Sequence, residues 1–221
     1  GKKIGRVPMA GIPHHAAERY CSIIIQKGFS IALCDQLESI QNKEGKLLKR
    51  GITRILTPGT VIEEGMLQAK KNNWLAAIAI NELSGEWGLA HADISTGEFF
   101  IKEGIKFDSL EQELLKIDAS EVICEKKDET AGSYDWCPKN IQLTRTAKTP
   151  FTLHEAKSTL KKHYKLTTIN GLGIHDNEMA IKSAGGLLAY LKETNPTNTA
   201  NKNFAHIPIE FPKLCLNKEN L

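Results

Sequence analysis

The sequence predicts an α/β protein of two modules, the second of which contains a mixed β-sheet. Its 221 residues, 41% hydrophobic and 25% charged, have the composition of a globular protein with a sizeable core. In the second half, three strand-like runs are followed by alternating helices and strands, an order typical of α/β sheets. The charge also changes along the chain: residues 1–72 contain twelve Lys or Arg and six Asp or Glu, a net +6, whereas residues 73–221 are net −3.

The first module is predicted to begin with a loop over residues 8–13, because two prolines and a glycine in six positions exclude a regular element. A helix is predicted over residues 16–27, and Gly28 is expected to end it. Two strands follow, over residues 29–34 and 52–56. The first of these strands is predicted to be buried because most of its residues are apolar.

The end of the first module is marked by a turn and a polar stretch. In Thr57-Pro58-Gly59-Thr60, proline at the second position and glycine at the third predict a type II turn. Residues 68–73 contain two adjacent lysines and two adjacent asparagines. We place the domain boundary there, so that the modules are residues 1–72 and 73–203.

The second module is predicted to begin with three antiparallel strands, because turn signals separate three runs of strand-forming residues. The apolar period then becomes that of helices, with Ser109 and Thr152 at N-cap positions. The adjacent Gly185 and Gly186 indicate either reduced helix stability or close packing against a neighbour. The predicted strands are 74–81, 86–94, 97–102 and 121–124, the helices are 110–117, 153–163 and 177–193, and loops are expected at 126–132 and 194–203.

The basic character of the first module suggests a polyanionic partner, for which nucleic acid is the obvious candidate. A solvated basic face without a ligand would have the same charge, so composition leaves both interpretations open. No run of eighteen apolar residues is present, so no membrane span is predicted. The sequence opens without Met or an apolar leader, and we expect a portion of a longer protein without a signal peptide.

The cysteines and histidines do not predict a metal site. The five cysteines are widely scattered and form no C-x-x-C pair, so we expect reduced thiols in a cytoplasmic protein. The adjacent His14 and His15 have no carboxylate or cysteine at ligand spacing. Lining the start of a helix is the favoured interpretation of this pair.

The acidic residues do not predict a catalytic site either. Asp35, Glu38, Asp93 and Glu98 could form a two-metal nuclease cluster. However, Asp93 and Glu98 flank a hairpin turn, where acids are routinely solvated. The sequence also lacks the motifs G-x-x-x-x-G-K-[ST], G-x-G-x-x-G and G-x-S-x-G. We therefore predict no catalytic residues and no metal ligands in this chain.

Five strings in the chain stand out by their identity, order and spacing. They are PMAGIPHHAA at residues 8–17, IALCDQLE at 31–38, RILTPGT at 54–60, NWLAAI at 73–78 and DISTGEF at 93–99. Together these strings resemble the MutS family of DNA mismatch-repair proteins. Residues 184–191 are similar to the last connector helix of that family, and residues 214–221 to the entry into its lever domain. The resemblance thus extends over nearly the whole chain.

The resemblance implies a domain architecture. Residues 1–72 would be the C-terminal part of a small mixed α/β mismatch-binding domain, and residues 73–203 an RNase H-like connector domain. Residues 204–221 would lead into the lever domain. The family's mismatch-reading Phe-x-Glu motif lies upstream of PMAGIP, and the 221 residues do not contain it. We therefore expect the first domain to be incomplete, and the connector to act as a scaffold because residues 74–80 contain no acid.

The resemblance also implies a function, the recognition of mismatched double-stranded DNA through its minor groove. Pro8 and Met9 would lie against the sugar edges, Gly11 would allow close backbone approach, and Arg54 would contact a phosphate. The expected partners are mismatched DNA and, through the connector, MutL, with the whole protein a homodimer. The chain itself is expected to be non-enzymatic and without a cofactor, because ATP and Mg²⁺ bind in the family's ATPase domain.

Two other hypotheses stay open. The first is an RNase H-like nuclease, which requires clustered acids at adjacent strand ends. The second is a protein-interaction module without a role in DNA binding. Cleavage that depends on a divalent metal would distinguish the nuclease, and salt-dependent DNA binding would distinguish the mismatch-repair protein from the interaction module.

Overall fold

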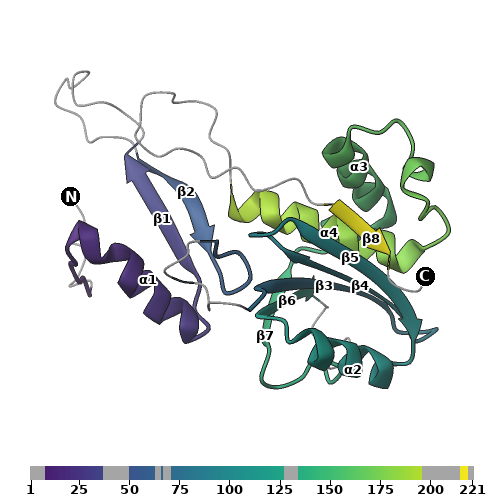
Figure 1. The fold of residues 1–221 in the computed structure, drawn as a ribbon, viewed down its shortest axis with the longest axis horizontal. Coiled ribbons are helices and arrows are strands. Elements are labelled where there is room, and N and C mark those ends of the chain that lie inside the picture. Colours follow the sequence, from purple (N-terminus) through teal and green to yellow (C-terminus); the bar gives the residue numbers. More distant parts are fainter. Residues whose placement is uncertain are drawn as a thin grey trace, which may run out of the picture.

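The computed structural model describes residues 8–36, 50–62, 66, 71–126, 134–195 and 215–218. These residues form one sheet of two strands and one sheet of six strands, with helices packed beside both (Figure 1). The predicted mixed α/β class is therefore confirmed. Within these ranges, no helix is long and apolar enough to cross a membrane.

The first module contains the short 3-10 helix η1 (His14–Ala16), the helix α1 (Ala17–Gln26) and the strands β1 (Ile31–Gln36) and β2 (Arg50–Leu56). The two strands pair antiparallel. Gly28 follows α1 with a φ of 79°, a left-handed conformation that glycine adopts without strain. The predicted helix and its glycine stop are confirmed.

The core of the first module is small. Ile25, Leu56 and Val61 are buried together, and β1 alternates between half-buried and exposed positions. The prediction of a buried strand over residues 29–34 is wrong, because Phe29 lies before β1 and is 62% exposed. A strand is buried on both faces only when both are covered, whereas the described residues of this module cover one face of its sheet.

The turn at residues 57–60 is present, and the Thr60 amide donates to the Thr57 carbonyl at 3.0 Å. The predicted type II geometry is wrong, because it requires a positive φ at Gly59, which this residue does not have. Position 59 requires glycine for a different reason, because the fold leaves no space for a side chain there. An added Cβ would lie 2.7 Å from Cδ1 of Leu75 and 3.0 Å from Cβ of Glu121. The turn therefore lies directly against the second module.

The second module contains the six-stranded sheet, whose strand order is β7-β6-β3-β4-β5-β8. Its elements are β3 (Trp74–Asn81), β4 (Glu86–Asp93), β5 (Glu98–Ile105), α2 (Phe107–Ile117), β6 (Glu121–Glu125), β7 (Gln142–Thr146), η3 (Thr149–Phe151), α3 (Leu153–Tyr164), η4 (Ile169–Leu172), α4 (Glu178–Thr194) and β8 (Cys215–Lys218). Strands β3, β4 and β5 form the predicted antiparallel meander. The parallel pairs are β3–β6, β6–β7 and β5–β8, so the sheet is mixed as predicted.

Helices cover both faces of this sheet (Figure 1). Helix α2 packs on the face that contains Ile78 and Leu89, and α3 and α4 pack on the opposite face against Leu75 and Ile101. Because β3 is central and covered on both sides, residues 75–79 are all buried. This burial explains why the sequence of β3 is a continuous apolar run rather than an alternating one.

Of the two predicted N-cap positions, that of Ser109 is wrong and that of Thr152 is confirmed. Helix α2 begins before Ser109, whose hydroxyl donates to the Lys106 carbonyl at 2.7 Å and accepts from the indole Nε1 of Trp87 at 3.1 Å. Thr152 is the N-cap residue of α3, but its hydroxyl donates backward to the Thr149 carbonyl at 2.8 Å. Both hydroxyls therefore donate to a backbone carbonyl, rather than accepting from a backbone amide as a helix cap does.

Strands β7 and β8 were not predicted from the sequence. Both are edge strands, and β7 is mostly polar, so neither has the apolar run that identifies a central strand. Residues 68–70 of the predicted boundary lie outside the described residues. So do nearly all of the predicted loops at 126–132 and 194–203, of which only residues 126, 194 and 195 are described.

The glycine pair of α4 lies at a helix contact. A Cβ added to Gly185 would lie 2.4 Å from Cα of Ala156 on α3, and one added to Gly186 would lie 2.4 Å from Cε1 of Phe151. Of the two interpretations of this pair, close packing is confirmed.

A cluster of three rings lies on the α2 face of the sheet. The ring centroid of His91 is 5.0 Å from that of Trp74 and 5.2 Å from that of Phe100. His91 is buried, and its Nδ1 has no hydrogen-bond partner among the residues that the structure describes. Burial lowers the pKa of His91 to about 4, although the nearby charge of Glu113 acts in the opposite direction. His91 is therefore neutral at pH 7 and packs as an aromatic ring.

Candidate nucleic-acid interface

The loop of residues 8–13 lies immediately before η1 and is exposed throughout. Met9 is 97% exposed, and Ile12 is also among the exposed large apolar side chains. A Cβ added to Gly11 would meet no atom within 4 Å among the described residues beyond its chain neighbours. Exposed apolar side chains on an open backbone are suited to insertion into a minor groove. The loop that contains Pro8, Met9 and Gly11 is therefore a candidate interface.

The basic side chains of the first module are described only in part, because seven of its twelve Lys and Arg lie outside the described residues. Among the described ones, Arg19, Lys27 and Arg50 are exposed. Lys71 forms an ion pair with Asp118 at 2.5 Å. Arg19 is the described base that follows the loop most closely in the sequence, which makes it the first candidate for a phosphate contact near the loop.

Arg54 does not lie on the exposed surface. Its side chain is 7% exposed, and its guanidinium Nη2 donates to the Thr60 carbonyl at 3.4 Å. The expectation that Arg54 contacts a phosphate does not fit this burial, because such a contact needs an accessible guanidinium. The side chain instead supports the turn at residues 57–60.

The turn that follows β2 meets the second module at Glu121, the first residue of β6. The Glu121 side chain is 0% exposed. Its Oε2 accepts from the Thr57 hydroxyl at 2.5 Å and from the Gly59 amide at 3.0 Å. Its Oε1 accepts from the Thr144 hydroxyl at 2.7 Å and from the Tyr190 hydroxyl at 2.8 Å. One carboxyl group therefore joins the turn to β7 and α4.

The partners of Glu121 match an ionised carboxylate. The Gly59 amide can only donate. Burial, and next the negative charge of Glu121, raise the pKa of Tyr190, so its hydroxyl keeps its proton and can donate. An ionised carboxylate accepts about four hydrogen bonds, as many as it receives here. Such bonds are needed because a buried charge without partners is strongly unfavourable.

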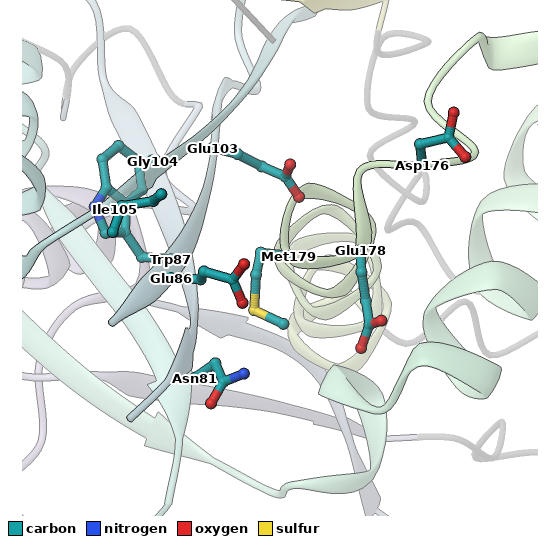
Figure 2. A pocket seen from close by; sticks show the side chains of 9 residues that line it. All are labelled: Asn81, Glu86, Trp87, Glu103, Gly104, Ile105, Asp176, Glu178 and Met179. Atoms are coloured by element: carbon teal, nitrogen blue, oxygen red, sulfur yellow. The ribbon is translucent and has the colours of Figure 1, made fainter. Parts of the chain in front are cut away.

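A hollow of about 470 Å³ lies where β4 and β5 meet the start of α4 (Figure 2). Its lining includes four carboxylates, those of Glu86, Glu103, Asp176 and Glu178. Glu103 accepts from the Ala180 amide at 2.7 Å and so satisfies a donor of the first turn of α4. The negative charge of this hollow opposes phosphate binding, so we do not assign it to the nucleic-acid interface.

The described acids considered for a nuclease cluster lie in two places: Asp35 lies in the two-stranded sheet, whereas Asp93 pairs with Glu98 across the strands β4 and β5. The Asp35 carboxylate, in the two-stranded sheet, accepts from the Thr53 hydroxyl at 2.6 Å. The Asp93 carboxylate, at the end of β4, accepts from the Ser95 hydroxyl at 2.6 Å. Glu38 lies outside the described residues. Across the described ranges, no three His, Cys, Asp or Glu side chains are placed to hold a metal ion, so the nuclease hypothesis gains no support there.

Sequence reasoning missed Glu121. The available signal was an acid next to the apolar residues 122–124 in a strand predicted to lie within the second module. Such an acid needs hydrogen-bond partners if it is buried. The partners Thr57, Thr144 and Tyr190 are far apart in the sequence, and no periodicity links them.

The comparisons with known proteins agree with the motif order. Residues 1–65 match the family model of MutS domain I, and residues 73–208 match that of MutS domain II. The whole chain aligns with proteins named DNA mismatch repair protein MutS, at 65% identity with one from Prochlorococcus marinus, 50% with one from another strain of that species, and 48% with one from a Synechococcus strain. The chain spans 25%, 24% and 24% of the length of these three relatives. The chain therefore belongs to the MutS family of DNA mismatch-repair proteins.

Proposed function

We propose that this chain contributes to the recognition of mismatched double-stranded DNA, with the first module at the minor groove and the connector linking it to the rest of the protein. The observation that carries this proposal is the exposed loop of residues 8–13, in the part of the chain that matches MutS domain I. Apolar side chains beside basic ones are the means by which minor-groove proteins bind a kinked duplex. The relatives are named DNA mismatch repair protein MutS, which supports the same function.

Each residue of the loop has a proposed role. Pro8 and Met9 lie against the sugar edges, and Gly11 allows the backbone to approach the duplex because the space around its Cβ position is open within the described part of the chain. Exposed bases such as Arg19 contact phosphates. Arg54 is assigned to the support of the turn instead, because it is buried. Phosphate contacts are the same for every DNA sequence. They therefore suit a protein that detects how easily the duplex deforms, whatever its base sequence.

The connector is proposed to be an RNase H-like scaffold. The antiparallel strands β3 to β5, followed by the parallel strands β6 and β7 with helices on both faces, support this fold. We keep the division into residues 1–72, 73–203 and 204–221, although β8 adds residues 215–218 to the connector sheet. We also propose that MutL binds the connector, that the whole protein is a cytoplasmic homodimer, and that its ATP and Mg²⁺ bind outside these residues.

A binding titration with matched and G·T-mismatched duplexes tests the proposal. We expect a dissociation constant on the order of 10⁻⁴–10⁻⁶ M for the 221-residue chain. With two to four phosphate contacts, the affinity should fall roughly 10- to 150-fold between about 50 and 200 mM salt. The preference for the mismatch should be less than about tenfold, because the Phe-x-Glu motif is not among these residues. Binding that does not depend on salt would contradict the proposal, and a larger preference would place discriminating residues within this chain.

A pair of matched variants locates the interface. Met9→Ala removes an exposed apolar side chain from the loop, and Leu83→Ala removes another, 100% exposed, from the turn between β3 and β4. If Met9 is buried against the duplex, its loss should weaken binding about five- to tenfold. Leu83→Ala should leave the affinity unchanged. Equal effects of the two substitutions would remove the loop from the interface.

A further inference from the structure

We infer that Glu121 is a positioning residue, whose buried carboxylate holds the turn at residues 57–60 on the connector and so fixes the orientation of the module that presents the loop at residues 8–13. The inference rests on the proposed function for the consequence of that orientation in DNA binding. The hydrogen bonds that support it do not depend on DNA. They are a property of the junction between the two modules.

The carboxylate divides its bonds between the two modules. Its Oε2 accepts from the first module, at the Thr57 hydroxyl and the Gly59 amide. Its Oε1 accepts from the connector, at the Thr144 and Tyr190 hydroxyls. Glu121 itself lies in β6, which pairs with the central strand β3, so its backbone is held in the sheet. One buried charge therefore connects the end of β2 with the sheet and with α4.

A hydrogen-bonded series continues from this carboxylate into the first module. The Thr57 hydroxyl proton is used in the bond to Glu121. In the 2.9 Å contact between the Thr57 and Thr60 hydroxyls, Thr60 must therefore be the donor. The Thr60 carbonyl accepts from the guanidinium of Arg54 in β2. The series thus begins at a buried cation in the first module and ends at the buried anion of the connector.

A second contact fixes the same turn from the side of β3. The Asn73 side chain donates from Nδ2 to the carbonyls of Pro58, at 3.0 Å, and Val61, at 3.3 Å. The Asn73 backbone amide donates to the carboxylate of Asp93 at 3.0 Å. The turn is therefore held at two points of the connector. Because Gly59 lies in contact with Leu75 and Glu121, it has no room to move closer.

The test measures hydrogen exchange of the Gly59 amide and the affinity ratio for mismatched over matched duplex, both in the natural full-length protein. Thr57→Val removes one hydroxyl without a change of shape, and Glu121→Ala removes the carboxylate. Thr53→Val is the matched control, because the Thr53 hydroxyl bonds to Asp35 and not to Glu121.

We expect Thr57→Val and Glu121→Ala to speed exchange at residues 57–62 about tenfold or more, the range for loss of a hydrogen bond to a charged group. Exchange in β3 should change much less, so that the effect is local to the junction. The affinity ratio should fall with both variants. Thr53→Val should leave both measurements at the wild-type level.

Glu121→Gln provides the conservative variant. Its side-chain carbonyl can face the Gly59 amide and the Thr57 hydroxyl, while its NH₂ group faces Thr144 and Tyr190, whose hydroxyl oxygens can also accept. This variant should therefore keep most of the protection at Gly59. A role in bulk stability alone would instead raise exchange throughout the connector, in proportion to the loss of stability.

The outcomes separate this inference from the proposed function. If Thr57→Val leaves exchange at Gly59 unchanged, or if Thr53→Val has the same effect, the positioning role of Glu121 is wrong whatever the DNA results. If the wild-type protein shows no preference for the mismatch, the proposed function fails, and the exchange data still decide whether Glu121 holds the turn. Local loss of protection with an unchanged affinity ratio would limit Glu121 to the junction and overturn its link to recognition.

Discussion

Replacing Gly185 by alanine tests whether α3 and α4 are in backbone contact. In an exposed helix this change stabilises by about 1 kcal/mol, because alanine has the higher helix propensity. In this structure the added Cβ would lie 2.4 Å from both Cα and Cβ of Ala156. The obstacle includes backbone, so no flexible side-chain end can move aside. The two helices would have to separate by about 1 Å.

The net effect follows from these two opposing terms. Overpacking of a well-packed core costs about 1–3 kcal/mol, and a backbone contact belongs at the upper end. After the gain in helix propensity is subtracted, we expect the free energy of unfolding to fall by about 2 kcal/mol. For a chain of this size, the melting temperature should fall by roughly 4–8 °C.

Urea and thermal unfolding, followed by circular dichroism, measure this effect. Gly171→Ala is the matched control, because its added Cβ would lie 3.5 Å from Cδ2 of Leu166, an ordinary van der Waals contact. The control should change stability by less than about 0.5 kcal/mol. An unchanged or raised midpoint for Gly185→Ala would show that propensity outweighs packing, and would refute the close contact between α3 and α4.

Three further predictions concern pH, proteolysis and catalysis. An unfolded histidine titrates near 6.5, whereas burial lowers the pKa of His91 to about 4. As pH falls below about 6.5, only the unfolded state gains this proton, so His91 should reduce stability by about 2 kcal/mol between about pH 6.5 and 5. His91→Phe keeps the ring packing and should flatten that part of the pH profile of urea unfolding; an unchanged slope would assign it to other groups. Limited proteolysis should cut at or before residues 68–73 and leave a resistant piece within 73–203, because the connector buries cores on both faces of its sheet; a resistant piece that ends before Asn73 would contradict an autonomous connector. Neither ATP hydrolysis nor Mg²⁺- or Mn²⁺-dependent cleavage of DNA or RNA should exceed the blank in standard assays, and a co-purifying cleavage activity abolished by Asp93→Asn would restore the nuclease hypothesis.

Much of the connector could be predicted because its signals are local. The apolar run of β3 and the turn residues around β4 identify these strands without reference to the rest of the chain. The spacing of apolar residues in α4 likewise identifies a helix. The edge strands β7 and β8 lack such runs, because an edge strand needs fewer apolar neighbours to pair with the sheet.

The candidate site likewise has one part that the sequence predicts and one part that it does not. A loop at residues 8–13 was predicted from its prolines and glycine, and the structure shows that this loop is exposed. The burial of Arg54 was not predicted, because the sequence of a strand does not show whether an arginine side chain faces the solvent or the interior. In the folded protein the turn brings the carbonyl of Thr60 within hydrogen-bond distance of the Arg54 guanidinium.

The sequence by itself determined the family, the order of the main elements and the exposed loop, because motifs and periodicity are written in neighbouring residues. Only the tertiary structure decided the geometry of the turn at residues 57–60 and the role of Glu121. The turn is not type II, since Gly59 lacks the positive φ that this type requires, and Leu75 and Glu121 leave no space for a side chain there. The carboxylate of Glu121 finds its four donors on three separate segments, and a buried charge is stable only where the fold brings such donors together.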